Sequence, residues 1–383
     1  MNRRKFFKLL TLGGIGTAFS PLLLKNLYGK PGLPGKPATN ISDAMKYPRT
    51  EFSMPGKLPA RVIQVTHDKC ILENKIDFSA ADEMLRKGML RLTGAGDIPS
   101  AWQNFVSDKD VIGIKVNPIG GAQLSTSREV VKSVISQLEE AGIPATNIVI
   151  WDRRMPDLEE AGFTEANFPG IRIAATEFKD KNGSFYDEKG KLYSEEMMDK
   201  NWYYWADVEE KYDAETIPYM TNEGKYSYFT KIVTQQVDKI INIPILKNAG
   251  ASITLAMKNL AFGSISNTSR LHKDLWAETC AEVCAFPPLR DKVILNIADG
   301  IKGCFQGGPG ANPQFFTEYK TILLATDPVA LDRIGYEIVL KKRIEEKIQK
   351  ADYPAARKYM DLAQELGLGT AELEKIKLEK ITL

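Results

Sequence analysis

Apolar residues along this chain fall into buried strands and one-sided helices. Residues 110–116 form an apolar run typical of a buried strand, and residues 147–151 form a second one. Between them, apolar residues recur every three or four positions, as on the inner face of a helix: Val130, Val131, Val134, Ile135 and Leu138. Thr126 and Glu129 have the spacing of a capping box at the start of this helix. A strand, a crossover helix and a strand in this order predict a parallel sheet.

The same patterns continue on both sides of this unit. Further strands are predicted at residues 62–66, 239–243, 291–297 and 321–325. Helices are predicted to begin at Ser79, at Pro328 after the cap Asp327, and at about Pro354. We therefore predict an α/β fold with a mostly parallel sheet, helices on both of its faces, and an inserted polar and aromatic segment.

The chain divides into three stretches. Residues 1–30 form a predicted signal peptide, residues 31–60 a linker rich in proline and glycine, and residues 61–383 a single α/β domain. An insertion is predicted at about residues 179–227, which is polar apart from the aromatic group at residues 202–205. That group either packs against the main sheet or forms part of a lid over a site.

The first 24 residues have the pattern of an export signal. A basic start that includes Arg3 and Arg4 precedes a mostly apolar run at residues 9–24. The paired arginines followed by Phe6 and Phe7 resemble the twin-arginine consensus, whereas a chance basic start on an ordinary secretory signal is the alternative. The resemblance implies the twin-arginine export machinery as a partner and a periplasmic or extracytoplasmic location. No Ala-x-Ala site follows, which leaves open an uncleaved N-terminal anchor.

Charge and cysteine content narrow the classes of function. The net charge is +2, and removing the six basic residues of segment 1–30, which contains no acid, leaves −4. A mildly acidic mature domain argues against nucleic acid as a partner. Cys280 and Cys284 lie one helical turn apart, a spacing that fits either a pair of buried thiols or two metal ligands. Neither of the other two cysteines, Cys70 and Cys304, completes a Cys-x-x-Cys motif.

Five segments, in order, resemble one family. Residues 254–263 read Thr-Leu-Ala-Met-Lys-Asn-Leu-Ala-Phe-Gly, and the other segments are 110–117, 241–247, 298–300 with 307–310, and 326–332. With this set, residues 60–370 are similar to members of domain-of-unknown-function family 362. Many members of that family carry an attached iron–sulfur segment. The Cys-x-x-Cys runs of that segment are missing here, so we expect no iron–sulfur cluster, and the cofactor is unknown.

Lysines near strand ends are the first candidates for chemistry. Lys115 lies at the end of one apolar strand, and Lys247 lies just beyond another. A buried lysine is unfavourable unless it meets an anion or a carboxylate, so each binds an anionic ligand or pairs with a structural acid. Lys258 and Asn259 follow the loop at residues 248–253, whose small residues can turn N–H groups toward an anion at a helix start. A surface lysine is the alternative for Lys258.

His272 is one of only two histidines and is the candidate for proton transfer. With Lys247 and Lys115 it makes up the predicted catalytic set. Asp152 and Asp299, each placed at a strand end, are candidates to bind a metal or to balance the lysines.

The remaining candidates are predicted to bind substrate: Asn117, Lys258, Asn259, Gly307 and Gly308. Ligands of open parallel sheets bind beyond the carboxyl ends of the strands, and Asn117 follows directly on one such end. Gly307 and Gly308 either let the backbone approach a ligand closely or form a surface turn.

Two hypotheses about function follow. The first is an exported enzyme that binds a small anionic substrate or cofactor, a carboxylate or a phosphate, at the carboxyl edge of the sheet. The second is a non-catalytic binding or accessory protein exported in folded form. The sequence contains no G-x-S-x-G, no P-loop and no His-Glu-x-x-His, so nothing in it favours nucleophilic hydrolysis or nucleotide-driven chemistry.

Overall fold

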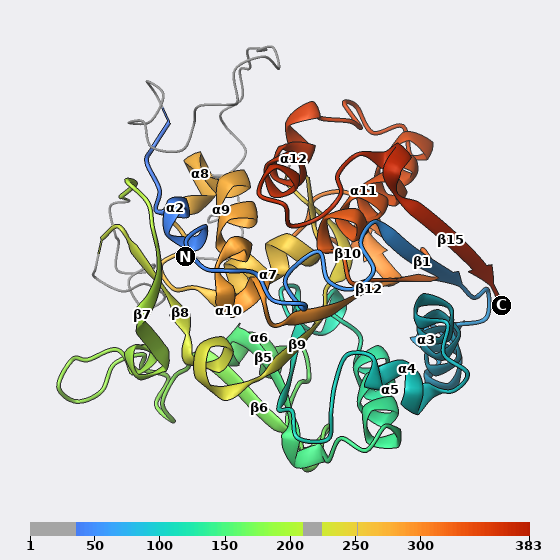
Figure 1. Cartoon of the computed structure of the whole chain (residues 1–383), viewed down its shortest axis with the longest axis horizontal. Helices are drawn as coiled ribbons and strands as arrows, with labels where there is room; N and C mark the ends of the chain where they lie inside the picture. The colour runs from blue at the N-terminus through green and yellow to red at the C-terminus, as the bar shows by residue number, and fades with distance from the viewer. Residues whose placement is uncertain (1–35, 210–223, 251) are drawn as a thin grey trace.

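A mixed sheet forms the centre of the molecule (Figure 1). The structure is a computed structural model that describes residues 36–209, 224–250 and 252–383, so the predicted signal peptide lies outside the described residues. Eight strands cross the sheet in the order β15 (Lys377–Thr382), β1 (Arg61–Thr66), β14 (Thr321–Ala325), β12 (Val293–Cys304), β9 (Lys239–Ile243), β4 (Ile112–Val116), β5 (Ile148–Arg154) and β6 (Arg172–Glu177). β14 is antiparallel to both of its neighbours, and the other pairs on this path are parallel. The mostly parallel α/β fold is confirmed.

Shorter strands complete the sheet or lie apart from it. β10 (Ile245–Ala249), β11 (Ser252–Thr254) and β13 (Phe316–Thr317) extend it beside the second half of β12. β2 (Ile71–Leu72) pairs with β3 (Lys75–Ile76), and β7 (Met198–Trp205) pairs with β8 (Tyr226–Thr230).

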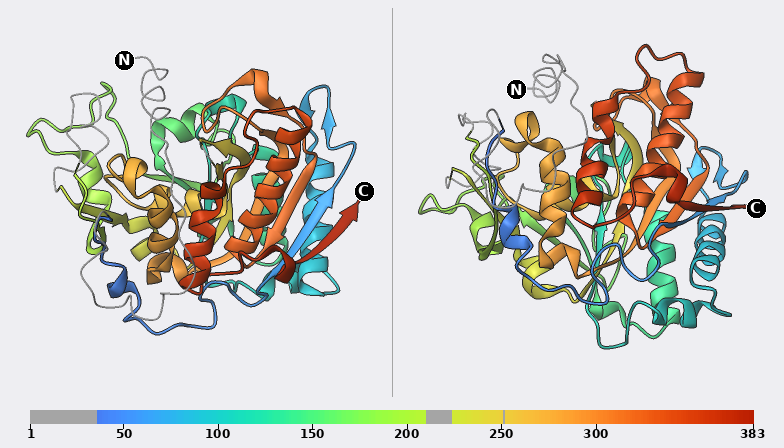
Figure 2. Two further views of the ribbon diagram at one scale, coloured as in Figure 1. Left: turned by 90° about the horizontal axis from the view of Figure 1, so that it is seen from above. Right: turned by 45° about the horizontal axis from the view of Figure 1, so that its top comes forward.

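Helices cover both faces of the sheet (Figure 2). On one face lie α3 (Phe78–Thr93), α4 (Ile98–Gln103), α5 (Arg128–Glu140) and α6 (Met155–Glu160). On the other lie α7 (Ala256–Ser264), α9 (Trp276–Glu282), α11 (Pro328–Glu345) and α12 (Lys358–Glu365). Three short helices are α2 (Ile41–Ala44), α8 (Leu271–Asp274) and α10 (Pro287–Arg290). Successive strand residues point to opposite faces, so Ile240 belongs to the core under α7 and Ile241 to the core under α5.

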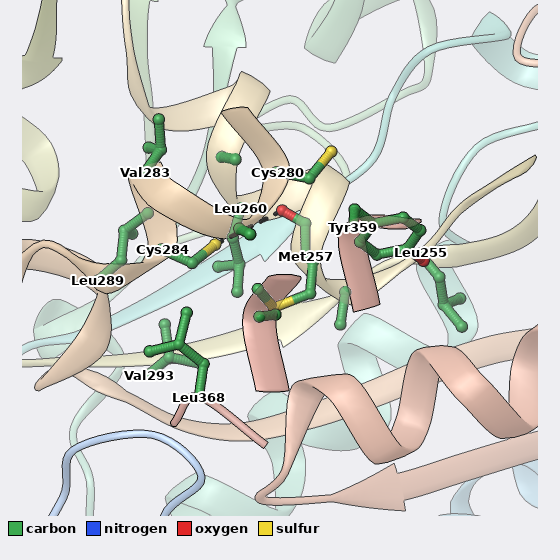
Figure 3. Close-up of a cluster of buried hydrophobic side chains, with 14 of the residues drawn as sticks. Leu255, Met257, Leu260, Cys280, Val283, Cys284, Leu289, Val293, Tyr359 and Leu368 are labelled. Carbon is green, nitrogen blue, oxygen red and sulfur yellow. Dashed lines mark hydrogen bonds between the residues drawn. The ribbon is translucent and has the colours of Figure 1, made fainter. Parts of the chain in front are cut away.

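Helix α7 is packed into the apolar core around Met257 and Leu260 (Figure 3). Cys280 and Cys284 lie in the same cluster, where burial raises the pKa of both thiols. All four cysteines are free and buried. Among the described residues no group of three or more histidine, cysteine or acidic side chains is arranged to hold a metal ion. The surroundings favour a pair of buried thiols over metal ligands for Cys280 and Cys284.

Two helix starts differ from the prediction. α5 begins at Arg128, and Thr126 does not cap it: the Thr126 hydroxyl accepts from Asn117 N (2.9 Å) and donates to Ile243 O (2.6 Å). The capping box is therefore wrong, because the threonine bridges two strand ends instead. α3 begins at Phe78 with Asp77 as its cap, one residue before the predicted start. The predicted cap at Asp327 is confirmed by its bonds from Val329 N (3.0 Å) and Ala330 N (2.8 Å).

The predicted loop at residues 248–253 is wrong. Asn248 and Ala249 belong to β10, and Ser252 and Ile253 belong to β11. Lys247 lies inside β10, paired with Thr254 and Cys304, rather than beyond a strand. The first N–H groups of α7 also have partners, because Asp332 accepts from Ala256 N (2.6 Å) and Met257 N (3.1 Å). The start of α7 is therefore not an anion site.

The β7–β8 hairpin carries the aromatic group of the predicted insertion. Tyr204 is fully buried, its hydroxyl donates to Glu282 (2.9 Å), and its ring meets Phe286 edge-on. These contacts give Tyr204 a packing role beside α9 and α10 rather than against the main sheet. Residues 210–223 of the insertion lie outside the described part of the chain.

Candidate functional site

Lys115 is fully buried on the face of β4 that α7 covers. Its ammonium pairs with Asp152 and donates to Asn259 Oδ1 (3.0 Å) and to Val116 O (2.7 Å). All three donors of the ammonium are therefore satisfied inside the protein. Burial lowers the pKa of Lys115, and Asp152 opposes that shift. Of the two interpretations weighed for Lys115, the structure favours the one in which it balances an acid.

A line of buried amides continues from Lys115 across the sheet. Asn259 donates to Asn242 Oδ1 (2.8 Å), Asn242 donates to Asn296 Oδ1 (2.9 Å), and Asn296 donates to Thr326 O (3.2 Å). Lys115 can only donate and the carbonyl of Thr326 can only accept, so the two ends fix the orientation of every amide between them. This ladder holds Asn259 in place as the acceptor for Lys115.

Asn117 branches from this ladder at the carboxyl end of β4. Its Nδ2 donates to Asn259 Oδ1 (3.2 Å), and its backbone N–H donates to Thr126. Its Oδ1 is buried and has no hydrogen-bond partner among the residues that the structure describes. A buried acceptor without a partner is unfavourable, so Asn117 Oδ1 is suited to a donor from a ligand or a water molecule.

Gly263 makes room for the Lys115 pair. It lies in the last turn of α7, and a Cβ atom there would stand 2.3 Å from Lys115 Cε, 2.7 Å from Lys115 Nζ and 3.3 Å from Asp152 Oδ1. Contacts below 3 Å require a displacement of the lysine. The glycine of this segment therefore has a steric function that its position at a helix end alone would not indicate.

Lys258 lies one turn from Phe262 on the same helix, its side chain half-buried. Within the described ranges it has no hydrogen bond or ion pair to an acid, and its ammonium lies 6.0 Å from the centroid of the Phe262 ring. Burial lowers the pKa of the Lys258 ammonium. Lys258 is thus a partly buried cation without a compensating charge, in contrast to Lys115.

His272 on α8 and Lys258 both lie beside the ring of Phe262. The ring centroid of His272 is 4.4 Å from that of Phe262, and its Nδ1 is 2.9 Å from Thr268 O. A carbonyl can only accept, so the neutral ring carries its proton on Nδ1 and keeps a lone pair on Nε2. Burial, and secondarily the Lys258 ammonium, lower the pKa of His272 to about 3. The ring is therefore neutral near pH 7, with the lone pair of Nε2 free of any hydrogen bond to Thr268.

Lys247 is fully buried where β10 meets the loop between β4 and α5. Its amine hydrogen-bonds to Ile119 O and to Leu124 O, the latter at 3.1 Å. Burial, with a smaller contribution from the Lys258 ammonium, lowers the pKa of Lys247 to about 7.

The strand-end basic residues Arg153 and Arg154 were missed by the sequence analysis. Both pair with the buried Glu177, and Arg153 also donates to Thr268 Oγ1 beside His272. Their positive charges help to lower the pKa of His272. The signal that would have found them is an Asp-Arg-Arg sequence at the carboxyl end of a buried strand.

Asp299 belongs to a different part of the sheet from Asp152. It lies within β12, three strand spacings from β5, or about 14 Å. One metal ion holds its ligands within about 5 Å of one another, so Asp152 and Asp299 do not bind one metal ion together. The carboxylate of Asp299 instead accepts hydrogen bonds from Ile301 N (3.2 Å) and from Ser127 N (2.7 Å). The second of these provides an acceptor for the backbone N–H group just before α5.

Gly308 and Gly307 are closely surrounded by other residues that the structure describes and do not border an open cavity. A Cβ atom on Gly308 would lie 1.8 Å from Asn248 O, and one on Gly307 would lie 2.5 Å from Asn312 Nδ2. Gly308 permits a close approach to the backbone of β10, and Gly307 a close approach to the side chains of Asn312 and Phe315, which argues against the predicted contact with substrate.

Two surface hollows, of about 590 and 300 Å³, lie along α5, α6 and β6. None of the predicted site residues lines either hollow. In the part of the chain that the structure describes, no helix is long and apolar enough to cross a membrane.

These features define an α/β protein in which basic side chains and a neutral histidine gather at the carboxyl edge of the central strands. The family model described as "Domain of unknown function (DUF362)" matches residues 112–337, and the chain belongs to that family. The matched region contains every candidate side chain of this edge.

Comparison with other proteins adds one structure. The fold is similar to a crystal structure of a protein from Thermotoga maritima, with 10% sequence identity and a TM-score of 0.36. The alignment covers 70% of this chain and 59% of that one, so this chain spans less than two thirds of that protein. No curated protein matches the sequence.

Proposed function

We propose that this protein is an exported enzyme that binds a small carboxylate or phosphate at the carboxyl edge of its sheet. The anion is held by Lys258, with Asn117 as an acceptor for a second polar group of the ligand. His272 removes a proton from the bound ligand. The export part of the proposal is supported by the sequence of residues 1–30 alone.

The observation that carries the proposal is the uncompensated charge of Lys258. Lys115 pairs with Asp152, the two arginines share Glu177, and Lys247 has two backbone carbonyls as hydrogen-bond acceptors. Lys258 has no such partner among the described residues, although it is half-buried beside the apolar ring of Phe262. A ligand carboxylate or phosphate would supply the missing charge through charge-assisted hydrogen bonds, worth about 1.5–3 kcal/mol each.

The role of His272 follows from its hydrogen bond. Thr268 O fixes the ring in the tautomer with a free Nε2 lone pair, as a general base requires. Burial, helped by the Lys258 cation, lowers the pKa of His272 and keeps the ring neutral. A ligand anion on Lys258 would place the rest of a small molecule near Nε2.

The test of the anion site is a comparison of two lysine variants. Thermal-shift screening of small dicarboxylates and phosphates against the wild type identifies a ligand, and calorimetry then measures its affinity for Lys258→Met and Lys273→Met. Both changes remove one positive charge, but Lys273 is exposed and lies beyond His272. We expect Lys258→Met to weaken binding at least tenfold, equivalent to about 1.4 kcal/mol, and Lys273→Met to leave it nearly unchanged. Equal losses in the two variants would indicate general electrostatic attraction and would refute the site.

His272 distinguishes an enzyme from a binding protein. In His272→Gln the amide can still donate to Thr268 O, but no basic nitrogen remains. An enzyme would lose turnover of the identified ligand and retain its binding. If the variant bound and turned over the ligand as the wild type does, the proton-transfer role would be wrong, and the non-catalytic alternative would gain support.

A further inference from the structure

Lys247 occupies a different environment from every other lysine at this edge. Its stem shares one side of β10 with Ile245, in a small apolar cluster that also contains Leu124 and Cys304. The cluster leaves no part of the side chain exposed. Cys304 is paired with Lys247 across the strands, and its own thiol donates to Gln306 O (2.9 Å).

The hydrogen bonds of Lys247 match a neutral amine better than an ammonium. An ammonium has three donors, whereas a neutral amine has two donors and a lone pair. Lys247 has two acceptors, Ile119 O and Leu124 O, and no ion pair to a carboxylate among the described residues. An ammonium would keep one N–H unpaired in an apolar cluster, while an amine would have both donors satisfied and its lone pair unused.

Lys115 provides an internal comparison. It is equally buried on the neighbouring part of the sheet, but it has three acceptors, one of which is the carboxylate of Asp152. The acceptors of Lys115 are those of a charged lysine. Lys115 has one more acceptor than Lys247 and a carboxylate beside it. These are the partners that the additional N–H and the positive charge of an ammonium need.

We propose that Lys247 acts as a nucleophilic amine that forms an imine with the carbonyl carbon of an aldehyde or 2-oxo acid. This inference rests on the proposed function for the anionic end of the ligand, which Lys258 would hold. The nitrogen lone pair attacks the carbonyl carbon and forms the C–N bond. The carbonyl oxygen leaves as water with the two protons that the amine nitrogen loses, so the step needs no oxidant and no additional proton.

The electrostatics of the site support this role. Burial lowers the pKa of Lys247 to about 7, and the Lys258 ammonium acts in the same direction, whereas Asp152 and a Cys304 thiolate would act against it. At pH 7 roughly half of such a lysine is neutral, compared with about one part in 3,000 for a lysine with an ordinary pKa near 10.5. The advantage in reactive fraction is therefore about a thousandfold.

The loop between β4 and α5 covers the amine of Lys247. Both acceptors of Lys247 belong to this loop, where Ala122 and Gln123 are exposed and Gly120 and Gly121 have positive φ angles of 119° and 61°. Lifting the loop breaks the two hydrogen bonds of the amine and exposes its nitrogen in the same movement. In the structure, the same loop that accepts both hydrogen bonds of the amine also shields it from solvent.

The test uses imine trapping on the full-length folded protein. Wild-type protein is incubated at pH 7 with cyanoborohydride and either glyoxylate, an anionic aldehyde, or propionaldehyde, a neutral one. Peptide mass spectrometry then gives the modification rate of each lysine. Lys273 is the reference in the same molecule, because it is exposed and reacts as an ordinary lysine.

We expect Lys247 to be modified at least tenfold faster than Lys273 with both aldehydes, and Lys115 to be modified more slowly than either. If Lys247 reacts no faster than Lys273, whether because it is charged or because the loop does not open, the inference is wrong. The Lys258→Met variant separates the two proposals. Loss of a preference for glyoxylate in this variant supports the anion site, whereas rapid modification of Lys247 without any such preference supports the amine alone.

Discussion

Replacing Gly263 with alanine tests how the Lys115 pair is accommodated. A Cβ atom at this position would stand 2.3 Å from Lys115 Cε, and Lys115 cannot move away without loosening its bonds to Asp152 and Asn259. Breaking a buried ion pair costs about 3–5 kcal/mol, because a charge is left buried and uncompensated. Alanine gains up to about 1 kcal/mol over glycine in a helix. We therefore expect a net loss of about 2–4 kcal/mol in the free energy of unfolding.

The assay is urea unfolding of the wild type and of two variants, Gly263→Ala and Gly96→Ala. Gly96 is an exposed loop glycine, and a Cβ atom there would meet nothing within 4 Å, so its replacement should be neutral or slightly stabilising. The midpoint of Gly263→Ala should fall, with an unchanged dependence on urea concentration.

A double-mutant cycle identifies the cause. Lys115→Met removes the charged nitrogen, so in that background Gly263→Ala should cost at least 1 kcal/mol less than in the wild type. The argument fails if Gly263→Ala is as stable as Gly96→Ala. It also fails if the cost of the alanine is the same with and without Lys115.

Two further predictions concern Lys247 and export. The pKa of Lys247 in the folded protein, about 7, lies below the ordinary value of 10.5. Between pH 7 and pH 10.5 the unfolded chain therefore binds one more proton than the folded protein. The free energy of unfolding of the wild type then rises with pH, by at most about 1.4 kcal/mol per pH unit. Lys247→Met lacks this gain. Urea unfolding at pH 7, 8 and 9 should therefore show the variant losing stability relative to the wild type with each step, and a difference that does not change with pH would contradict the neutral amine. Replacing Arg3 and Arg4 together by lysine should leave the protein in the cytoplasm, as cell fractionation would show; export of this double variant would rule out the twin-arginine assignment.

The sequence determined the elements whose signals are local. The β4–α5–β5 unit is confirmed because its apolar periodicity and its short connections are contained in adjacent residues, and the same holds for the Asp327 cap. The sequence also selected Lys258 and His272, which the fold brings together, and Lys115 with Asn259, which hydrogen-bond directly.

Only the tertiary structure determined the hydrogen-bond and ion-pair partners of each charged residue. Lys247 and Lys115 look alike in sequence, because each follows a mostly apolar run. In the structure, Lys247 donates to two loop carbonyls and Lys115 pairs with Asp152. Asp299 looks like a strand-end ligand, yet it satisfies the start of α5, 172 residues away in the chain. The protonation state of a buried group, and the hydrogen bonds that it can still make, depend on the donors, acceptors and charges within a few ångströms of it. Those neighbours come from strands and loops far apart in the chain, so no periodicity or local motif records them.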